Sequence, residues 1–236
     1  MCGRFTLHSS PADLQLAFRG FAFPDEIEPH YNIAPSLDVR HISNEGEKTV
    51  SKARWGLVPF WAKDPKIGNR MINARAETLA SKPAFRDAYQ HKRCLIIADG
   101  FFEWKKEAAG KTKVPMYITL KSGRPFAFAG LWDTWKQPDD HRLKTCTIIT
   151  TEPNDLMARI HNRMPVILPE NAYDLWLDPD TTESEILNGL LVPYRADEMT
   201  VHPVANTVNS PRNDLSECIA PVAMPTPEPP AQLSLL

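Results

Sequence analysis

The sequence lacks the cysteine spacing that marks metal sites and disulfide frameworks. Its four cysteines lie far apart and form no Cys-x-x-Cys pair: Cys2, Cys94, Cys146 and Cys218. Two of them fall in apolar, strand-like runs, RCLII and TCTII. We therefore expect reduced thiols in a cytosolic protein, with no bound metal and no other cofactor.

The sequence also lacks a charge excess and any long apolar run. Its formal net charge is -2, which excludes a histone-like binder and leaves only a local basic groove for nucleic acid. No stretch approaches the roughly 18 apolar residues of a membrane span, and no signal-peptide pattern opens the chain. We expect no membrane contact and a cytoplasmic location, nucleoid-associated when bound to DNA.

The first residues, Met1-Cys2-Gly3-Arg4, carry the rarest chemistry in the chain. If Met1 is removed, Cys2 presents an α-amine and a thiol on adjacent carbons. This 1,2-aminothiol attacks an aldehyde twice, first through nitrogen to form a Schiff base and then through sulfur to close a thiazolidine. Reference pKa values of roughly 7.7 to 8.0 for the amine and about 8.5 for the thiol leave a reactive fraction of each at neutral pH. The alternative is a cysteine with no role at this position.

Apolar, alternating segments separated by turns predict a mostly antiparallel β core with short flanking helices, an α+β fold. The expected strands cover residues 4–8, 39–42, 93–98, 101–104, 114–120, 126–132, 145–151 and 200–208. Between residues 93 and 104, a turn at Asp99-Gly100 is expected to join two strands. The expected helices cover residues 10–20, 77–92 with a break at Pro83, 171–176 and 182–190.

Several polar residues interrupt these segments in patterns that favour binding or proton transfer. The run RWGLVPFWAK interleaves aromatic rings with cations, as a groove for single-stranded nucleic acid requires, although buried core is the alternative. Asn73 and Arg75, two apart in an extended segment, share one face and can hold an anion or a sugar-phosphate. The loop Tyr31 to Ser36, with Asn32 and Pro35, can contact a ligand.

Two side chains are candidates for acid-base chemistry. Glu103 lies on a strand between Phe102 and Trp104, where a carboxylate is expected to lose part of its hydration. The alternative is an outward-facing strand residue. His161 lies in a loop just before an apolar strand, near Arg163 and the polar strand end at Thr150, although a loop histidine can also be structural.

The composition changes at residue 211. Residues 221–230 hold five prolines and no aromatic residue, so we expect residues 211–236 to be a disordered, proline-rich tail after a folded domain of residues 2–210. The last five residues, Gln232 to Leu236, resemble the short peptide with which bacterial replication and repair proteins bind the sliding clamp. A chance apolar end is the alternative.

Taken together, the sequence resembles the SOS-response-associated peptidase (SRAP) family. The resemblance spans roughly residues 2–210 and rests on these stretches, in family order: MCGRF, YNIAPS, RWGLVPFW, INARAET, RCLIIADGFFEW, FAGLW, TIITTEPN and IHNRMPVIL. Ile97 departs from the proline that the family often has, and it touches no proposed role. The resemblance implies a barrel-like fold and a covalent crosslink, through the N-terminal cysteine, to abasic sites in single-stranded DNA.

The resemblance also implies roles for individual residues. Cys2 would be the nucleophile, Glu103 and His161 the acid-base groups, and Asn73 would lie near the opened sugar. The implied DNA contacts are Arg4 and Arg75 on phosphates, Trp61 and Trp104 near bases, and Asn32 and Pro35 along the groove, with Thr150 and Arg163 added from the strand end.

This agrees with the chemistry of an aminothiol, because a ring-opened abasic sugar is an aldehyde. Two other functions stay open: an N-terminal-cysteine peptidase or amidohydrolase, including one that removes only the protein's own first residue, and a non-catalytic reader of modified bases. We expect a monomer.

Overall fold

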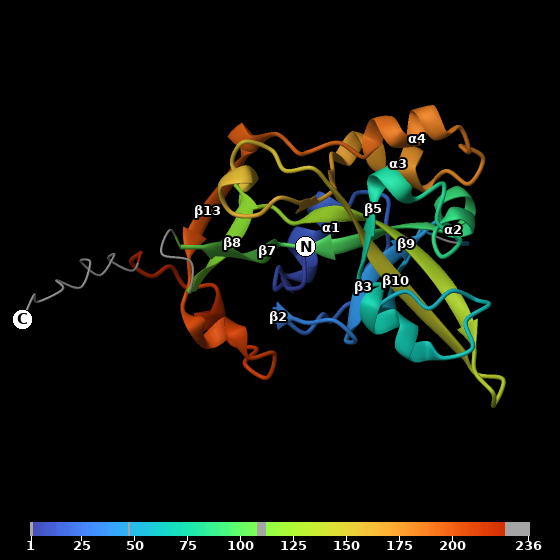
Figure 1. Ribbon diagram of the computed structural model, residues 1–236, viewed down its shortest axis with the longest axis horizontal. Coiled ribbons are helices and arrows are strands. Elements are labelled where there is room, and N and C mark those ends of the chain that lie inside the picture. Colours follow the sequence, from blue (N-terminus) through green and yellow to red (C-terminus); the bar gives the residue numbers. More distant parts are fainter. Residues whose placement is uncertain (1, 47, 108–111, 225–236) are drawn as a thin grey trace, which may run out of the picture.

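The protein folds around two β-sheets, as a computed structural model shows (Figure 1). The structure describes all residues except 1, 47, 108–111 and 225–236. The smaller sheet has the strand order β13-β8-β7-β1-β2. Its strands are β13 (Met199–Pro203), β8 (Lys113–Leu120), β7 (Gly100–Lys106), β1 (Phe5–Leu7) and β2 (His30–Ile33).

The larger sheet contains a closed barrel. Its strands follow the order β10-β4-β3-β6-β9, and β9 also pairs with β10, which closes the ring. All these pairs are antiparallel except β4 with β10. The barrel strands are β10 (Arg142–Thr151), β4 (Val50–Trp55), β3 (Asp38–Ser43), β6 (Arg93–Ala98) and β9 (Phe126–Lys136). Three short strands extend this sheet: β5 (Asn73–Arg75), β11 (Met164–Pro165) and β12 (Ile167–Leu168). The predicted barrel-like, mostly antiparallel α+β fold is confirmed.

The two sheets share one core, which holds the N-terminal strand in place. The ring of Phe5 on β1 packs edge-on against Trp55 and Phe128 of the barrel, with centroid distances of 5.1 and 5.8 Å. Phe5 itself has no exposed surface. Because aromatic rings dominate core energetics, this contact holds the start of the chain against the barrel rather than leaving it to fray.

Strands β6 and β7 follow each other directly but belong to different sheets. The sequence predicts a turn at Asp99-Gly100, and β6 does end at Ala98. The two strands then diverge: β6 pairs with β3 and β9, whereas β7 pairs with β1 and β8. Asp99 sits at the branch, where its N–H donates to the carbonyl of Thr6 (2.9 Å). The segment therefore connects the sheets instead of forming a hairpin.

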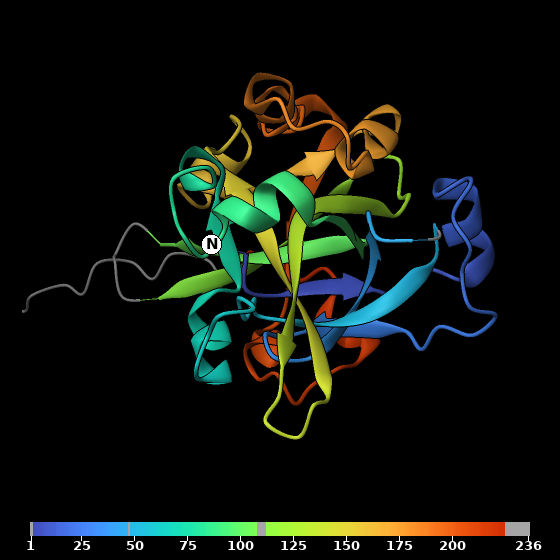
Figure 2. The same cartoon turned by 90° about the vertical axis from the view of Figure 1, so that its right-hand side faces the viewer.

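Short helices lie outside the strands (Figure 2). The α-helices are α1 (Pro11–Ala17), α2 (Arg86–His91), α3 (Tyr173–Leu177) and α4 (Ser184–Leu190). Short 3₁₀ helices are η1 (Pro65–Arg70), η2 (Ala76–Thr78), η3 (Met157–Arg159), η4 (Glu170–Ala172), η5 (Ala196–Glu198), η6 (Asn206–Asn209) and η7 (Ser216–Cys218). As the sequence predicts, α1 begins after Ser10, whose hydroxyl accepts the N–H of Asp13. The expected break near Pro83 separates η2 from α2.

A buried arginine fastens two of these helices to the barrel. Arg93 of β6 has no exposed surface, and every acceptor of its guanidinium among the described residues is a backbone carbonyl. The acceptors are Tyr89 and Gln90 near the end of α2, and Trp176, Asp178 and Thr181 at and after the end of α3. Because the last carbonyls of a helix lack partners within it, one fixed cation satisfies both ends.

A second buried group gives the fold a pH dependence. His41 on β3 has no exposed surface, and burial, followed by the charge of Lys144, lowers its pKa to about 4. The unfolded chain takes up this proton near pH 6.5, whereas the folded protein does so only near pH 4. We expect the free energy of unfolding to fall by about 3 kcal/mol as the pH drops across this window.

The measurement is urea unfolding at steps between pH 7 and pH 4. His41→Gln is expected to flatten the curve above pH 5, although its stability at pH 7 changes as well. The exposed His141→Gln is the control and is expected to keep the wild-type slope. Equal slopes in wild type and His41→Gln would contradict the assignment.

The pKa of Glu77 is lowered, chiefly by a hydrogen bond from Arg163. Its protonation reduces the free energy of unfolding only below about pH 4.5, outside most of this window.

The folded body extends beyond the boundary predicted at residue 210. Val204 forms a β-bridge with Pro221, η7 lies inside the predicted tail, and Cys218 has no exposed surface. The domain therefore continues to at least residue 222, since side chains of this segment pack into a core that composition alone does not reveal. The predicted clamp peptide, Gln232 to Leu236, lies outside the described residues. Within the described residues, no helix has the length and apolar character needed to cross a membrane.

Candidate active site

Cys2 lies just before β1, in the segment that leads into the strand, and is fully enclosed by protein. Its exposed fraction is 0%. The strand register aligns it with β7, because the N–H of Phe102 donates to the carbonyl of Arg4 at 2.9 Å. This pairing brings the N-terminal residues alongside Glu103. The strand predicted over residues 4–8 thus positions the candidate nucleophile inside the sheet.

Asn73 reaches the same place from the other sheet. Strand β5 runs parallel to β10, with Asn73 opposite Ile148. The Asn73 side-chain N–H donates to the carbonyl oxygen of Cys2 at 2.7 Å, which fixes the backbone of the nucleophile. Its Oδ1 is buried and has no hydrogen-bond partner among the described residues. A buried amide oxygen without a partner is costly, and it is suited to accept a hydrogen bond from a ligand.

Glu103 is buried beside Cys2. Its exposed fraction is 3%, so the alternative of an outward-facing strand residue is wrong. Burial, and then the charge of Glu103, raise the pKa of the Cys2 thiol well above its usual range. The sequence alone predicted a partly ionised thiol, but a thiolate is disfavoured where water is excluded. At neutral pH the thiol therefore keeps its proton, and attack by sulfur requires a base.

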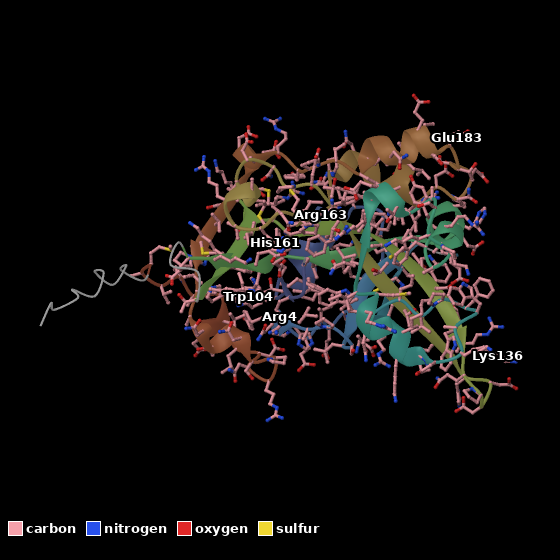
Figure 3. The ribbon with its side chains drawn as sticks, in the orientation of Figure 1. Arg4, Trp104, Lys136, His161, Arg163 and Glu183 are labelled. Carbon is pink, nitrogen blue, oxygen red and sulfur yellow. The ribbon has the colours of Figure 1, made fainter. Side chains whose placement is uncertain are left out.

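His161 and Arg163 form a second group at the end of β10. The N–H of Arg163 can only donate, and it lies 3.1 Å from Nδ1 of His161. Nδ1 also lies 3.2 Å from the carbonyl oxygen of Arg163, which can only accept, so the backbone of Arg163 holds this ring nitrogen in either neutral tautomer. The Arg163 guanidinium makes a bidentate ion pair with Glu77 (2.6 and 3.0 Å) and donates to the carbonyl of Thr150. Figure 3 shows His161 and Arg163 on the same side of the smaller sheet.

Two of the predicted DNA-contact residues, Thr150 and Arg163, have partners within the protein. Thr150 has no exposed surface, and its hydroxyl donates to the carbonyl of Ala74 (3.4 Å). Arg163 already has Glu77 as a counterion. Both residues therefore hold the loop of His161 and strand β5 in place. Their direct contact with DNA stays a prediction.

Arg4 and Trp104 lie together on the face of the smaller sheet (Figure 3). The guanidinium carbon of Arg4 is 5.9 Å from the Trp104 ring centroid, a cation–π distance. Nη1 of Arg4 donates to Oδ1 of Asn32 at 2.7 Å and to the carbonyl of Val208 at 2.8 Å. Asn32 is only 1% exposed, so its side chain supports Arg4 instead of lining an open groove.

Trp61 belongs to a separate, more exposed part of the predicted interface. Its ring is 49% exposed and lines a cavity of about 500 Å³. Three cations also line this cavity: Lys63, Lys66 and Arg70. An exposed aromatic ring among cations can stack on a base, and the contact of Trp61 with nucleic acid stays a prediction.

A close backbone crossing sets the position of this loop. A Cβ on Gly56 would lie 2.7 Å from the carbonyl oxygen of Gly68, and a Cβ on Gly68 would lie 2.6 Å from that of Gly56. Gly56 also has φ +131°, which other residues rarely adopt. Two other predicted DNA contacts are more accessible than Cys2, which is buried. Arg75 is exposed, and Pro35 is half-buried.

Sequence reasoning missed several residues that organise the site. Each of them accepts a hydrogen bond from a predicted site residue: Glu77 from Arg163, Asn209 from Trp104, and Asp214 from the backbone N–H of Asn32. Asn209 and Asp214 follow the strand predicted over residues 200–208, which in the structure is β13 and ends at Pro203, with η6 over Asn206–Asn209. The polar run NSPRND carries no signal of its tertiary partners. The described residues contain no group of three or more His, Cys, Asp or Glu side chains placed to hold a metal ion.

Comparison with protein families and curated proteins finds close relatives. A family model described as SOS response associated peptidase (SRAP) matches residues 1–211. The chain is similar to "Abasic site processing protein YoqW" of Bacillus subtilis (strain 168), with 51% identity over 222 residues, 93% of this chain and 99% of the relative. It is also similar to "Abasic site processing protein HMCES" of Xenopus tropicalis, with 30% identity over 274 residues, 98% of this chain and 81% of the relative.

Comparison with solved structures supports the same fold. A crystal structure of a protein from Bacteroides thetaiotaomicron matches with a TM-score of 0.83 and 27% identity, covering 94% of this chain and all of that one. A second, from Bordetella bronchiseptica, matches with a TM-score of 0.73 and 25% identity over 86% of this chain.

Proposed function

Because the chain belongs to the SOS response associated peptidase (SRAP) family, we propose that it processes abasic sites in single-stranded DNA by a covalent crosslink through Cys2. The curated relatives named abasic site processing proteins support the handling of abasic sites in DNA. The crosslink, its chemistry and its residues are our own extension of that role. In the cell, such a crosslink would shield the lesion during the response to DNA damage.

The observation that carries the proposal is the enclosure of Cys2 by two polar groups. Asn73 holds its carbonyl oxygen, and the Glu103 carboxylate lies close enough to raise the pKa of its thiol. A core cysteine needs neither group. An N-terminal residue that must attack one carbon with two atoms needs a fixed backbone and a nearby proton acceptor.

The reaction begins with the abasic sugar. His161 assists the opening of the deoxyribose ring: the C1′ hydroxyl loses its proton, the bond from C1′ to the ring oxygen breaks, and the ring oxygen gains a proton, which leaves an aldehyde at C1′. The α-amine of Cys2, exposed by removal of Met1, adds to this carbon, and loss of one water gives a Schiff base.

Sulfur then completes the crosslink. Glu103 accepts the proton of the Cys2 thiol, the sulfur bonds to C1′, and the nitrogen takes up a proton as the C=N bond becomes single. The product is a five-membered thiazolidine, and one water is released overall. Closure removes the Schiff base from which β-elimination would break the strand, and reversal through the same groups would release the protein.

The DNA strand is held by charge and stacking. Arg4 and Arg75 contact phosphates, and Trp104 and Trp61 stack on bases on either side of the lesion. Single-stranded DNA suits this surface because its bases are free to stack on the two rings. A partner of this kind also agrees with a net charge of only -2, since the cations are local.

The test is intact-mass spectrometry of the full chain after incubation with single-stranded oligonucleotides. We expect a starting mass that lacks one methionine and, with one abasic site, a heat-stable adduct equal to protein plus DNA minus one water. An oligonucleotide with a tetrahydrofuran in place of the abasic sugar is the control, because it cannot open to an aldehyde. Absence of an adduct from protein that lacks Met1 would contradict the proposal.

A peptidase role has weaker support. The Asn73 amide beside a thiol resembles the donor that stabilises an oxyanion in acyl transfer. Thiol peptidases, however, attack as thiolates of lowered pKa, whereas the Cys2 pKa is raised by burial and by Glu103. Self-directed removal of the first residue stays a secondary hypothesis, tested by whether Cys2→Ser retains Met1.

A further inference from the structure

The last described part of the chain forms a closed loop under the smaller sheet. This C-terminal loop, residues 204–221, begins and ends at the bridge between Val204 and Pro221. It is drawn in orange-red beside β2 and β8 in Figure 1. Cys218 anchors it in a small core with Phe102 and Tyr117. The family match ends at residue 211, so half of the loop lies beyond it.

The loop accepts hydrogen bonds from the two predicted DNA-contact residues on this face, Trp104 and Arg4. Trp104 Nε1 donates to Oδ1 of Asn209 at 2.7 Å. Arg4 Nη1 donates to the carbonyl of Val208 at 2.8 Å. The position of the loop therefore decides where the Arg4 charge and the Trp104 ring face solvent (Figure 3).

Asn32 couples the loop to Arg4. Its Nδ2 donates to three loop carbonyls, those of Val208 (3.3 Å), Ser210 (3.0 Å) and Asn213 (2.6 Å). Its Oδ1 accepts from Arg4. One buried amide is thus shared between the loop and the guanidinium, and a shift of either changes the other.

A single carboxylate fastens the loop to the edge of the sheet. Strand β2 is the outer strand of the smaller sheet, so part of its backbone lacks a strand partner. Asp214 accepts the backbone N–H groups of Tyr31 (2.5 Å) and Asn32 (2.8 Å) through Oδ1. Its Oδ2 lies 2.6 Å from Nδ1 of His30. Asp214 therefore attaches the loop to β2 through three contacts to one charged acceptor, and hydrogen bonds to a charged group are stronger than neutral ones.

We propose that Asp214 is a positioning residue for DNA binding, acting through the C-terminal loop and Asn32 on Arg4 and Trp104. The inference rests on the proposed function, which makes these two side chains DNA contacts. Asp214 itself touches neither the DNA nor the reacting atoms. Its effect is to hold two side chains in their binding positions before DNA arrives, which removes the entropy cost of ordering them on binding.

The test measures non-covalent binding separately from chemistry. The full chain is titrated, by fluorescence anisotropy, into single-stranded DNA carrying the unreactive tetrahydrofuran site. We expect Asp214→Ala to raise Kd about tenfold, as two long side chains lose their fixed positions. The slope of log Kd against log salt is expected to decrease by about 0.7, the value of one lost phosphate contact on a single strand. The adduct rate at saturating abasic DNA should stay within about twofold, since binding is then complete.

Asp174→Ala is the matched control. It removes the same charge and one ion pair, with Lys48, on helix α3 far from the loop (Figure 1). Its Kd and salt slope should equal those of the wild type. Asp214→Asn keeps an acceptor for the two backbone N–H groups, so its Kd should be close to that of the wild type.

If Asp214→Ala does not fold, Asn209→Ala replaces it. This variant removes the hydrogen bond from Trp104, and it is expected to raise Kd with an unchanged salt slope, because Trp104 carries no charge.

A double-mutant cycle with Arg4→Ala decides whether Asp214 acts through Arg4. In the Arg4→Ala protein, Asp214→Ala should raise Kd less than about threefold, because one target of its action is already gone. Fully additive effects, or a salt slope of Asp214→Ala equal to that of the wild type, would overturn the inference; where Asn209→Ala is used, an unchanged Kd would do so. A wild-type protein that binds the tetrahydrofuran DNA but forms no adduct contradicts the proposed chemistry instead, and the cycle still tests Asp214.

Discussion

Cys2→Ala is expected to eliminate the heat-stable adduct with abasic DNA completely. Alanine retains the α-amine after Met1 is removed, so the Schiff base still forms, but no sulfur is present to close the thiazolidine. The open Schiff base either hydrolyses or loses the 3′ phosphate by β-elimination. We therefore expect strand cleavage in place of the crosslink, and an adduct only when borohydride reduces the Schiff base. Denaturing gels of labelled DNA, with and without borohydride, separate these products.

Two further variants control this result. Cys2→Ser presents an oxygen of the same reach, and its five-membered oxazolidine ring opens far more readily, so the adduct should not survive heating. Cys146→Ala removes another buried thiol of raised pKa, in strand β10, and should leave the crosslink intact. A heat-stable adduct in Cys2→Ala would show that another residue is the nucleophile.

Glu103→Gln is expected to slow adduct formation by about 10²- to 10⁴-fold, the usual contribution of a positioned acid-base group. Glutamine keeps the size of the side chain and can still form hydrogen bonds in a site that is 3% exposed, but it cannot accept the thiol proton. The rate is measured as single-turnover adduct formation at saturating abasic DNA. Borohydride trapping in the same reaction reports whether the Schiff base accumulates before closure.

The sign of this effect separates two roles for Glu103. Its negative charge raises the pKa of the Cys2 thiol, so a purely electrostatic neighbour would hinder sulfur attack. Glu103→Gln would then lower that pKa and speed closure. A slower reaction supports proton transfer, whereas a faster one contradicts it. Exposed Glu152→Gln, which removes a carboxylate at the end of β10, should react at the wild-type rate.

Burial makes the reactivity proposed for Cys2 depend on its neighbours more than the reactivity of the same aminothiol in water would. In water, a thiol and an amine on adjacent carbons both react near neutral pH. Inside the sheet, the ionised form of the thiol loses its hydration, and its pKa rises. The site therefore requires a proton acceptor at the sulfur, and Glu103 is the carboxylate whose charge the thiol senses.

Much of the fold could be predicted because its signals are local. The Ser10 cap, the apolar strand of residues 93–98 and the break near Pro83 depend on residues next to one another in the chain. The turn predicted at Asp99-Gly100 left open whether its two strands pair with each other, for the opposite reason. Two apolar strands joined by a turn have the same pattern whether they pair or separate into two sheets.

The site shows the same division. The types of residue at positions 2, 73, 103 and 161 indicate aldehyde chemistry with proton transfer, and the family motifs connect them to abasic DNA. Sequence could not reveal that Arg163 has Glu77 as a counterion, or that Asn32 serves Arg4. Each of these bonds joins segments dozens of residues apart. The clamp peptide and the monomeric state stay predictions.

By itself, the sequence determined the residue on which the proposed chemistry rests, Cys2 in a family pattern, within a chain of alternating strands. Only the tertiary structure decided that this cysteine is enclosed, that Asn73 binds its carbonyl oxygen, and that residues 204–221 fold back onto Arg4 and Trp104. The physical reason is that periodicity reports which face of one element is buried. Hydrogen bonds and desolvation depend on which elements from distant parts of the chain pack against that face. Closure of the barrel and the core shared by the two sheets determine which elements those are.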